Sequence, residues 1–260
     1  MPELPEVETV CRRLRREARG AGIVALRFAR TQAAAPQQAE DVARHAAGTR
    51  LEGVVRRGKN ILLQVSGGGV LRIHLRMTGN LYVVPDYRFR PATARAWFEL
   101  TDGRGIIFDD PRALGRIHWH RAEEIESVLR EVGPEPLSRD FTPESLLAAA
   151  RGSPKPAKIF LMDQRRVAGL GNIYAAEALF RAGIHPARPV NRIRRARILA
   201  LHAAIVSVLR EAVRCIGLDA GSFPLAVYGR KGEPCDVCGR RVRRLPQGGR
   251  STYFCPGCQR

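Results

Sequence analysis

The fold is decided by short runs of β-branched and aromatic residues within residues 23–120: IVALRF (23–28), ILLQV (61–65), VLRIHL (70–75), LYVV (81–84), AWFEL (96–100), GIIF (105–108) and RIHWH (116–120). The last run alternates strictly between polar and apolar residues. Glycine-rich breaks at SGGG (66–69) and DGRG (102–105) separate neighbouring runs. Short strands at this spacing are typical of an antiparallel sandwich or barrel. We therefore predict an N-terminal antiparallel β-sandwich.

Helical patterns flank this β-rich segment. Residues 5–19 form the first, with Pro5 in the opening turn, an apolar face through Val7, Val10, Cys11 and Leu14, and Gly20 at its end. Beyond the proline-rich GPEPLSRDF (133–141), Thr142 is expected to cap a further helix. Other helices are expected at residues 122–132, 156–163, 172–182 and 192–215.

These patterns predict an α+β fold in three parts. The N-terminal sandwich domain, with its flanking helices, is expected over residues 1–133 and a helical domain over residues 134–226. A small cysteine-bearing module is expected over residues 227–260. No internal repeat and no long low-complexity tract interrupts this order, and 45% hydrophobic content is enough for two modest domains or one large one.

The charge balance points to an anionic partner. The chain has 44 Lys plus Arg against 25 Asp plus Glu, a formal net charge of +19. Such a surface attracts polyanions, which favours nucleic acid as the binding partner. The alternative is a solvated basic surface on an unrelated enzyme. Lysine occurs only as Lys59, Lys155, Lys158 and Lys231, so a titratable side-chain amine has few candidates.

No apolar run approaches the length of a membrane span, and the N-terminal PELPEVET lacks a signal-peptide pattern. We therefore expect a soluble, intracellular protein of the cytoplasm that has no membrane partner. Cysteines in a reducing compartment rarely form disulfides, which favours metal binding where their spacing suits it.

Four cysteines form two C-x-x-C pairs, Cys235 with Cys238 and Cys255 with Cys258. This spacing is typical of a zinc ribbon, and four thiolates favour one zinc ion. Because protein ligands fill all four positions, the predicted site is structural. Cys11 and Cys215 show no such pattern and are expected to be small core residues. Several arginines between the pairs predict a basic β-hairpin suited to a DNA backbone: Arg240, Arg241, Arg243, Arg244 and Arg250.

The chain begins Met1-Pro2-Glu3. Initiator methionine is normally removed before a small residue such as proline, which would leave a free secondary amine. An α-amine has a reference pKa of about 8, well below that of lysine, so part of it is unprotonated near neutrality. Such an amine can attack an aldehyde-level carbon and form an iminium ion, with Glu3 beside it as a general acid or base.

A larger set of motifs resembles the formamidopyrimidine-DNA glycosylase and endonuclease VIII family, and the first branch more closely. The matching stretches follow the same order over essentially the full chain: PELPEVETV (2–10), RRGKNILL (56–63), HLRMTGNL (74–81), DDPRALGR (109–116), GPEPLS (133–138), LMDQRRVAGLGNIYAAEALFRAGIHP (161–186), VYGRKGEPC (227–235) and the terminal cysteine pairs.

The resemblance implies a β-sandwich with flanking helices, a helix–two-turn–helix lobe, a zinc finger, and DNA bound between the lobes. It implies a bifunctional DNA glycosylase and abasic-site lyase of base excision repair, which hydrolyses N-glycosyl bonds and cleaves the strand by β,δ-elimination. The implied partner is damaged double-stranded DNA, the implied metal is one structural zinc, and neither a nucleotide cofactor nor an oligomer is expected.

Catalytic roles carry over by matching position. Pro2 would be the nucleophile, Glu3 the accompanying proton donor, and Glu6 a supporting residue one helical turn along. Lys59, in RRGK, would bind phosphate and assist β-elimination. Arg250, in RSTYFC, would grip the backbone and is linked to δ-elimination. As alternatives, Glu6, Lys59 and Arg250 could be ordinary solvated charges.

DNA-binding roles carry over in the same way. Asn172, in GLGNIY, would bind phosphate at a helix N-terminus, where Gly169 and Gly171 allow close backbone approach. Asn172 could also be only a helix cap. Further DNA contacts are implied for His74, Tyr228, Lys155 and Lys158, of which His74 and Tyr228 could instead serve packing.

Three residues would fill the space that a flipped nucleotide leaves. Extruding a base costs a few kcal/mol, and wedge side chains usually hold the bent duplex open. The family uses Met, Arg and Phe, whereas this chain has Met77, Arg112 and Leu114, with Ala113 before the leucine. Leu114 can wedge by bulk but cannot stack as an aromatic ring does. Met77 could alternatively be a core methionine.

Two features depart from the family pattern. The segment CIGLDAGSFPLA (215–226) is shorter than the usual lesion-covering loop, and Thr93 stands near the place of an expected histidine. We hypothesise that formamidopyrimidines, oxidised pyrimidines or abasic sites are better substrates than 8-oxoguanine. The rival functions are a non-catalytic zinc-ribbon protein that binds damaged DNA and an unrelated metalloenzyme, against which the closed cysteine site argues.

Overall fold

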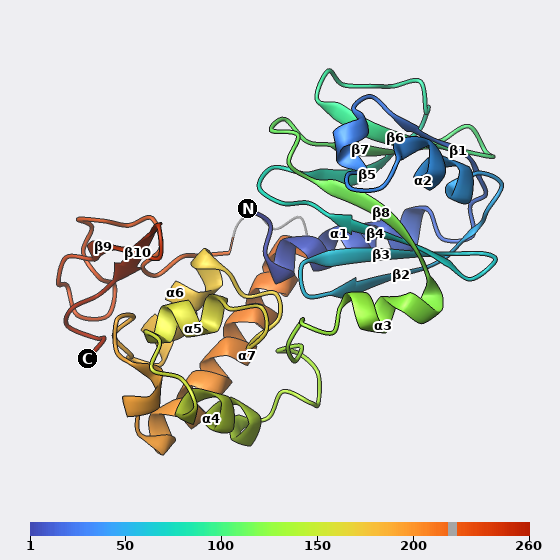
Figure 1. The fold of residues 1–260 in the computed structure, drawn as a ribbon. Coiled ribbons are helices and arrows are strands. Elements are labelled where there is room, and N and C mark those ends of the chain that lie inside the picture. The colour runs from blue at the N-terminus through green and yellow to red at the C-terminus, as the bar shows by residue number, and fades with distance from the viewer. Residues whose placement is uncertain (218–222) are drawn as a thin grey trace. The chain divides into compact units, whose positions relative to one another are not determined.

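The computed structural model describes residues 1–217 and 223–260. Two compact units make up the chain, Met1–Arg130 and Glu131–Arg260 (Figure 1). No helix among the described residues is both long enough and apolar enough to cross a membrane.

The first unit is a sandwich of two four-stranded antiparallel sheets, with strand orders β1-β6-β7-β5 and β2-β3-β4-β8. The core lies between them, where Leu26, Phe98 and Ile106 of one sheet and Leu63 and Leu71 of the other are buried. The predicted antiparallel β-sandwich is therefore confirmed. Its strands are β1 (Ile23–Phe28), β2 (Leu51–Arg57), β3 (Asn60–Val65), β4 (Gly69–His74), β5 (Asn80–Val84), β6 (Ala94–Leu100), β7 (Gly105–Asp109) and β8 (Arg116–Arg121).

Two helices flank the sandwich where its edge strands lie. Helix α1 (Leu4–Glu17) packs against β2 and β5, and α2 (Ala39–Ala46) packs against β1 and β8. Because these four strands are the edges of the two sheets, each helix covers one open side of the sandwich. The unit is completed by short helical turns: η1 (Thr31–Ala33), η2 (Ala122–Glu124) and α3 (Ile125–Val128).

The second unit is helical and ends in a hairpin. Helix α7 packs against both α4 and α6, while α6 also contacts α5 and β10. Thr142 caps α4 as expected, because its hydroxyl accepts the N–H of Ser145 at 3.1 Å. The elements are α4 (Pro143–Arg151), α5 (Ala157–Met162), α6 (Asn172–Arg181), η3 (Val190–Arg192), α7 (Arg195–Gly217), β9 (Arg243–Gln247) and β10 (Arg250–Phe254).

Three expectations about elements were wrong or incomplete. The helix predicted over residues 122–132 is a 3₁₀ turn followed by the four-residue α3, because the apolar positions there are too sparse to bury one face. Strand β2 was missed because Gly53 and two terminal arginines obscure the apolar pattern of LEGVVRR. Helix α2 was missed inside the presumed β-region, where no capping side chain marks its start.

Candidate functional site

The amino end of the chain leads directly into α1. Glu3 is the N-cap of this helix and is buried, and Pro5 occupies the first turn. A capping box fixes the geometry, because the backbone N–H of Glu3 donates to Glu6 Oε2 at 2.8 Å while the Glu3 side chain accepts the N–H of Glu6. Pro2 therefore directly precedes a buried carboxyl group whose position is fixed by the helix cap.

The turn between β2 and β3 carries Lys59, which is buried apart from about a tenth of its surface. Gly58 has φ +57° and starts this two-residue turn, a position where glycine is favoured in hairpins. Arg56, just before the turn, donates to Glu8 of α1 at 3.1 Å. This ion pair fastens the hairpin to the first turns of α1, so the elements bearing Glu3 and Lys59 are joined.

The charge of Glu8 is well compensated in this contact. Burial alone would raise the pKa of Glu8, but the hydrogen bond from Arg15 and the charges of Arg56 and Arg15 hold it below its ordinary value. The carboxylate thus stays ionised and keeps bonding to both guanidinium groups.

His74 ends β4, opposite Asn60 in the ladder that follows Lys59. Its Nδ1 accepts the backbone N–H of Arg76 at 3.0 Å. Burial, together with the charges of Arg76, Lys59 and Arg72, lowers the pKa of His74 to about 4. The ring is therefore neutral at physiological pH, and it contributes a hydrogen-bonding Nε2 rather than a charge to this part of the sandwich.

The wedge residues lie on two loops of the first unit. Met77, on the β4–β5 loop, is 40% exposed, and Leu114, on the β7–β8 loop, is 39% exposed. Arg112 is exposed on the same loop as Leu114. A core residue is buried, whereas Met77 is 40% exposed, so the alternative that Met77 is a core methionine is wrong.

In the second unit, Asn172 is the first residue of α6, and Gly171 rather than Asn172 is its N-cap. The side-chain N–H₂ of Asn172 donates to Tyr228 Oη at 3.3 Å and to the carbonyl of Ser251 at 3.1 Å. Its Oδ1 is buried with no hydrogen-bond partner in the described part of the chain. The structure therefore brings together Asn172, Tyr228 and the start of β10, three segments far apart in sequence.

The two lysines of this region take different positions. Lys158, expected to contact DNA, is completely buried, and its Nζ donates to Thr252 Oγ1 at 2.7 Å and to the Ser251 carbonyl at 3.2 Å. An ammonium with no exposed surface does not reach a phosphate from this position, so Lys158 instead holds β10. Lys155 is half exposed and pairs with Asp163 at 3.0 Å.

Arg250 opens β10 at the tip of the predicted basic hairpin. It is exposed, its backbone pairs with Gln247 of β9, and its side chain forms no hydrogen bond or ion pair with other residues that the structure describes. Gly248 and Gly249 make the tight turn before it with φ +58° and +69°. A Cβ at Gly248 would come within 2.7 Å of Ile159, so the hairpin tip lies directly on α5.

The four predicted metal ligands converge. The Sγ atoms of Cys235, Cys238, Cys255 and Cys258 all lie within 4.8 Å of one another. Tetrahedral zinc with Zn–S bonds of about 2.3 Å separates its sulfurs by about 3.8 Å, and the Cys235–Cys258 distance is 3.8 Å. The donor set and its size fit one structural zinc ion, and no coordination position is left for a substrate.

Sequence reasoning missed two buried carboxylates beside these residues. Glu177 of α6 accepts the backbone N–H groups of Ala226, Val227 and Tyr228 at 2.8–3.0 Å. Asp110, after β7, binds both wedge-bearing loops. Both residues lie inside motifs quoted for the family, and for Glu177 the available signal was a carboxylate between Ala176 and Ala178.

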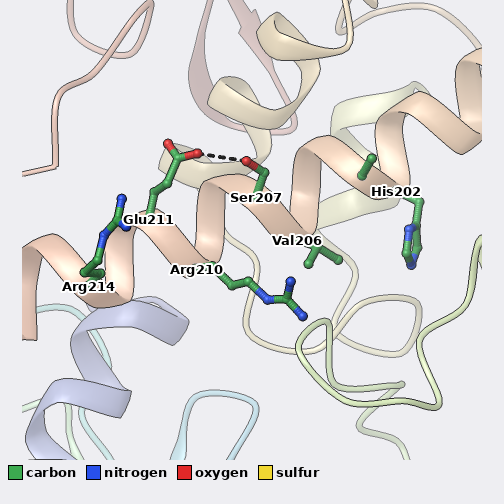
Figure 2. Close-up of a pocket in the computed structure, with 7 residues that line it drawn as sticks. His202, Val206, Ser207, Arg210, Glu211 and Arg214 are labelled. Carbon is green, nitrogen blue, oxygen red and sulfur yellow. Dashed lines mark hydrogen bonds between the residues drawn. The ribbon is translucent and has the colours of Figure 1, made fainter.

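One cavity of about 770 Å³ lies along α7 and contains none of the predicted site residues (Figure 2). Ser207 donates to Glu211 at 2.8 Å, as drawn there, and Glu211 also pairs with Arg181 of α6. These contacts fasten α6 to α7. The cavity is lined by His202, Ala203, Val206, Ser207, Arg210, Glu211 and Arg214.

Three family models match the chain in sequence order. The formamidopyrimidine-DNA glycosylase N-terminal domain matches residues 1–117, and the formamidopyrimidine-DNA glycosylase helix–two-turn–helix domain matches residues 132–222. The zinc finger found in FPG and IleRS matches residues 232–260. Together the three leave only short connecting segments unmatched.

Individual relatives agree with these matches. A formamidopyrimidine-DNA glycosylase of Chloroflexus aggregans is 40% identical over 276 residues, covering 100% of this chain and 98% of the relative. The Bacillus licheniformis enzyme of the same name is 38% identical over 275 residues, covering 100% of both.

Solved structures share the fold. The Lactococcus lactis enzyme, non-covalently bound to DNA containing an abasic site, has a TM-score of 0.92 at 31% identity, covering 99% of each chain. A MutM structure in complex with DNA containing carbocyclic 8-oxo-G has a TM-score of 0.94 at 32% identity, covering 100% of each chain. On the matched domains, the full-length identity and the shared fold, this chain belongs to the formamidopyrimidine-DNA glycosylase family.

Proposed function

We propose that this protein is a DNA glycosylase and abasic-site lyase of base excision repair, with Pro2 as its nucleophile. The observation that carries the proposal is the amino end of α1, where Pro2 precedes a buried Glu3 held in a capping box. Full-length kinship with curated formamidopyrimidine-DNA glycosylases supports the same reaction.

The chemistry follows from a free imino group at Pro2. Its lone pair attacks C1′ of the damaged nucleotide, the N-glycosidic bond breaks with its electrons going to the base, and the base takes up a proton. Glu3 is the proton donor, because its carboxyl group lies beside Pro2 in the chain. Glu3 then takes the proton from the Pro2 nitrogen and passes it to O4′ as the C1′–O4′ bond breaks, which leaves an iminium ion on Pro2 that acts as an electron sink.

Strand cleavage proceeds from this iminium. Removal of a proton from C2′ allows the 3′ phosphate to leave, and a second elimination releases the 5′ phosphate. Lys59 assists the first step and binds phosphate, and its position in a hairpin fastened to α1 supports this role. Arg250 assists the second step, which its exposed position at the hairpin tip supports.

DNA is the proposed partner. Asn172 and Tyr228 contact the backbone beside β10, Lys155 adds a further contact, and His74 offers a neutral ring in the first unit. The zinc ion keeps the hairpin folded and takes no part in the reaction.

Several finer properties are proposals as well. The protein acts in the cytoplasm as a monomer and uses no nucleotide cofactor, and its parts divide at residues 133 and 226. Lesion choice stays a prediction: five residues of the shortened loop, 218–222, lie outside the described residues. Formamidopyrimidines, oxidised pyrimidines and abasic sites remain the favoured substrates over 8-oxoguanine.

Borohydride trapping on duplex DNA with one abasic site tests the nucleophile. The wild type is expected to form a covalent cross-link after reduction of the iminium. Pro2→Gly leaves a primary α-amine at the same position and should reduce the cross-link, whereas Pro2→Gln leaves Met1 in place, moves the amine one residue away and should lose the cross-link. Mass spectrometry of each protein checks the state of the amino end.

Lys231→Met is the matched control, since Lys231 is an exposed amine in the second unit. It should trap like the wild type. A cross-link that persists in Pro2→Gln would contradict the proposal and transfer the attack to a lysine. Salt-sensitive DNA binding without any cross-link in the wild type would instead favour the non-catalytic DNA-binding protein.

A further inference from the structure

Asp110 follows β7 and is completely buried although it carries a carboxylate. Its Oδ1 accepts the hydroxyl of Thr78 at 2.5 Å, and its Oδ2 accepts the backbone N–H groups of Leu114 and Gly115, each at 2.7 Å. Burying a charge is unfavourable unless hydrogen bonds replace the lost water. Here both oxygens are bonded, and their donors come from two different loops.

Thr78 links the β4–β5 loop to Asp110 and to the β7–β8 loop. It lies one residue after Met77 on the β4–β5 loop, donates to Asp110, and accepts the backbone N–H of Arg112 at 3.3 Å. Its single hydroxyl thus acts as donor and acceptor toward the β7–β8 loop, which carries Arg112 and Leu114. Through this group the two loops contact each other directly.

Both loops hold a strained backbone beside their wedge residues. Arg76, before Met77, has φ +56°, and Ala113, between Arg112 and Leu114, has φ +53°. In the described part of the chain these are the two non-glycine residues with positive φ. Such conformations persist where surrounding contacts enforce them and often occur at functional sites.

Packing beneath the second loop adds to this constraint. A Cβ at Gly115 would lie 2.3 Å from the Phe108 ring, so the backbone there rests directly on the core. The β7–β8 loop is therefore held both by the packing of Gly115 on Phe108 and by the hydrogen bonds of Asp110. The wedge side chains Met77 and Leu114, on the loops that these contacts join, remain exposed.

We propose that Thr78 and Asp110 are positioning residues that join the two wedge-bearing loops into one preformed unit, so that Met77, Arg112 and Leu114 enter the duplex together. This inference rests on the proposed function. Loops that moved separately would each have to be ordered on DNA, whereas a joined pair is ordered when the protein folds. The effect is on base eversion and not on the bond-making step at Pro2.

Thr78→Val tests the link with little change in shape. Valine replaces the hydroxyl with a methyl group, so it neither donates to Asp110 nor accepts from Arg112. We expect lesion excision from duplex DNA to fall by about tenfold, the effect of one lost charge-assisted hydrogen bond. Fluorescence of 2-aminopurine placed opposite the lesion should report slower or weaker insertion of the wedge.

Thr78→Ser is the rescue variant, because it keeps the hydroxyl, and should behave like the wild type on duplex DNA. Thr101→Val is the matched control: Thr101 is exposed in the β6–β7 turn and makes no side-chain hydrogen bond to the described residues. It should leave excision unchanged. Circular dichroism on all variants checks that each is folded.

Single-stranded DNA with one abasic site separates positioning from general damage to the fold, because it contains no duplex to wedge. Trapping on it should be the same for wild type and Thr78→Val. Equal loss on both substrates, or wild-type excision by Thr78→Val from duplex, would overturn the positioning role. If the wild type formed no cross-link on either substrate, the proposed function would be refuted. The 2-aminopurine fluorescence would still measure insertion of the wedge residues and so would test the positioning role separately.

Discussion

His74 combines burial, three neighbouring cationic side chains and one backbone hydrogen bond at the end of β4. Its ring is neutral in the folded protein down to about pH 4, whereas the unfolded chain protonates the same ring near its ordinary pKa of 6.5. Between these values the unfolded state binds one more proton. Falling pH therefore favours unfolding through this residue.

We expect this residue to remove up to about 3 kcal/mol of stability as the pH falls from 6.5 to 4, with no further loss below that range. His74→Asn keeps an acceptor near the position of Nδ1 and removes the titration. Urea unfolding at several pH values should give a shallower pH dependence for the variant. Identical pH profiles for the two proteins would refute this account of His74.

Individual residues show where sequence reasoning reaches its limit. The sequence correctly assigned Cys235 and its three partners to one metal site, because ligand spacing constrains geometry directly. It placed Lys158 on DNA, yet the side chain is buried beneath β10. Whether a charged side chain points into or out of the fold depends on contacts distant in sequence, and a local pattern does not contain them.

At the scale of elements, Glu177 joins α6 to the segment that enters the zinc finger. Its carboxylate accepts three consecutive backbone N–H groups, those of Ala226, Val227 and Tyr228. Three such bonds compensate for burying the charge and fix the backbone that carries the Tyr228 ring. The orientation of Tyr228 toward Asn172 therefore depends on a residue that hydrogen-bonds to the Tyr228 backbone.

Glu177→Gln should destabilise the protein by about 2 kcal/mol, because its new N–H₂ group faces a backbone donor and leaves it unpaired. Thermal or urea unfolding measures the change. Glu211→Gln is the matched control: its partner Arg181 is partly exposed, and such a pair contributes about 0–1 kcal/mol. A Glu177→Gln protein as stable as that control would show that the three bonds are dispensable.

The elements themselves were largely predictable, and for a physical reason. Strands β1 and β3 and helix α4 carry clear periodicities or caps, and they appear where the pattern put them. Strand β2 lacks such a pattern, and its place is decided by pairing with β3 and packing under α1. Local sequence therefore predicts the elements whose own residues carry a clear periodicity or cap. The other elements are defined by their tertiary contacts.

Over the whole molecule, the net charge of +19 governs encounter with DNA. If about six phosphates are neutralised, affinity should fall on the order of 1000-fold between about 50 and 200 mM salt, because bound counterions are released. Fluorescence anisotropy with an abasic-site duplex measures this dependence. An affinity that does not change with salt concentration would exclude the proposed binding of DNA phosphates by the basic hairpin.

Two arginine variants locate the contacts. Arg250→Gln should make the slope of log affinity against log salt concentration shallower by about 1, because one phosphate contact is lost. Arg210→Gln removes an equal charge from the α7 cavity, which contains none of the proposed DNA contacts, and should leave the slope unchanged. Equal changes in both variants would mean that total charge, and not the position of Arg250, sets the affinity.

The scarcity and burial of lysine have a practical consequence for handling this protein. Lys158 is sealed in the interior and Lys59 is nearly so, whereas Lys155 is half exposed beside Asp163 and Lys231 is exposed. An amine-reactive dye or resin would therefore attach at Lys155, at Lys231 and at the terminal amine. Replacing both Lys155 and Lys231 would turn such reagents into a direct chemical probe of the terminal imino group.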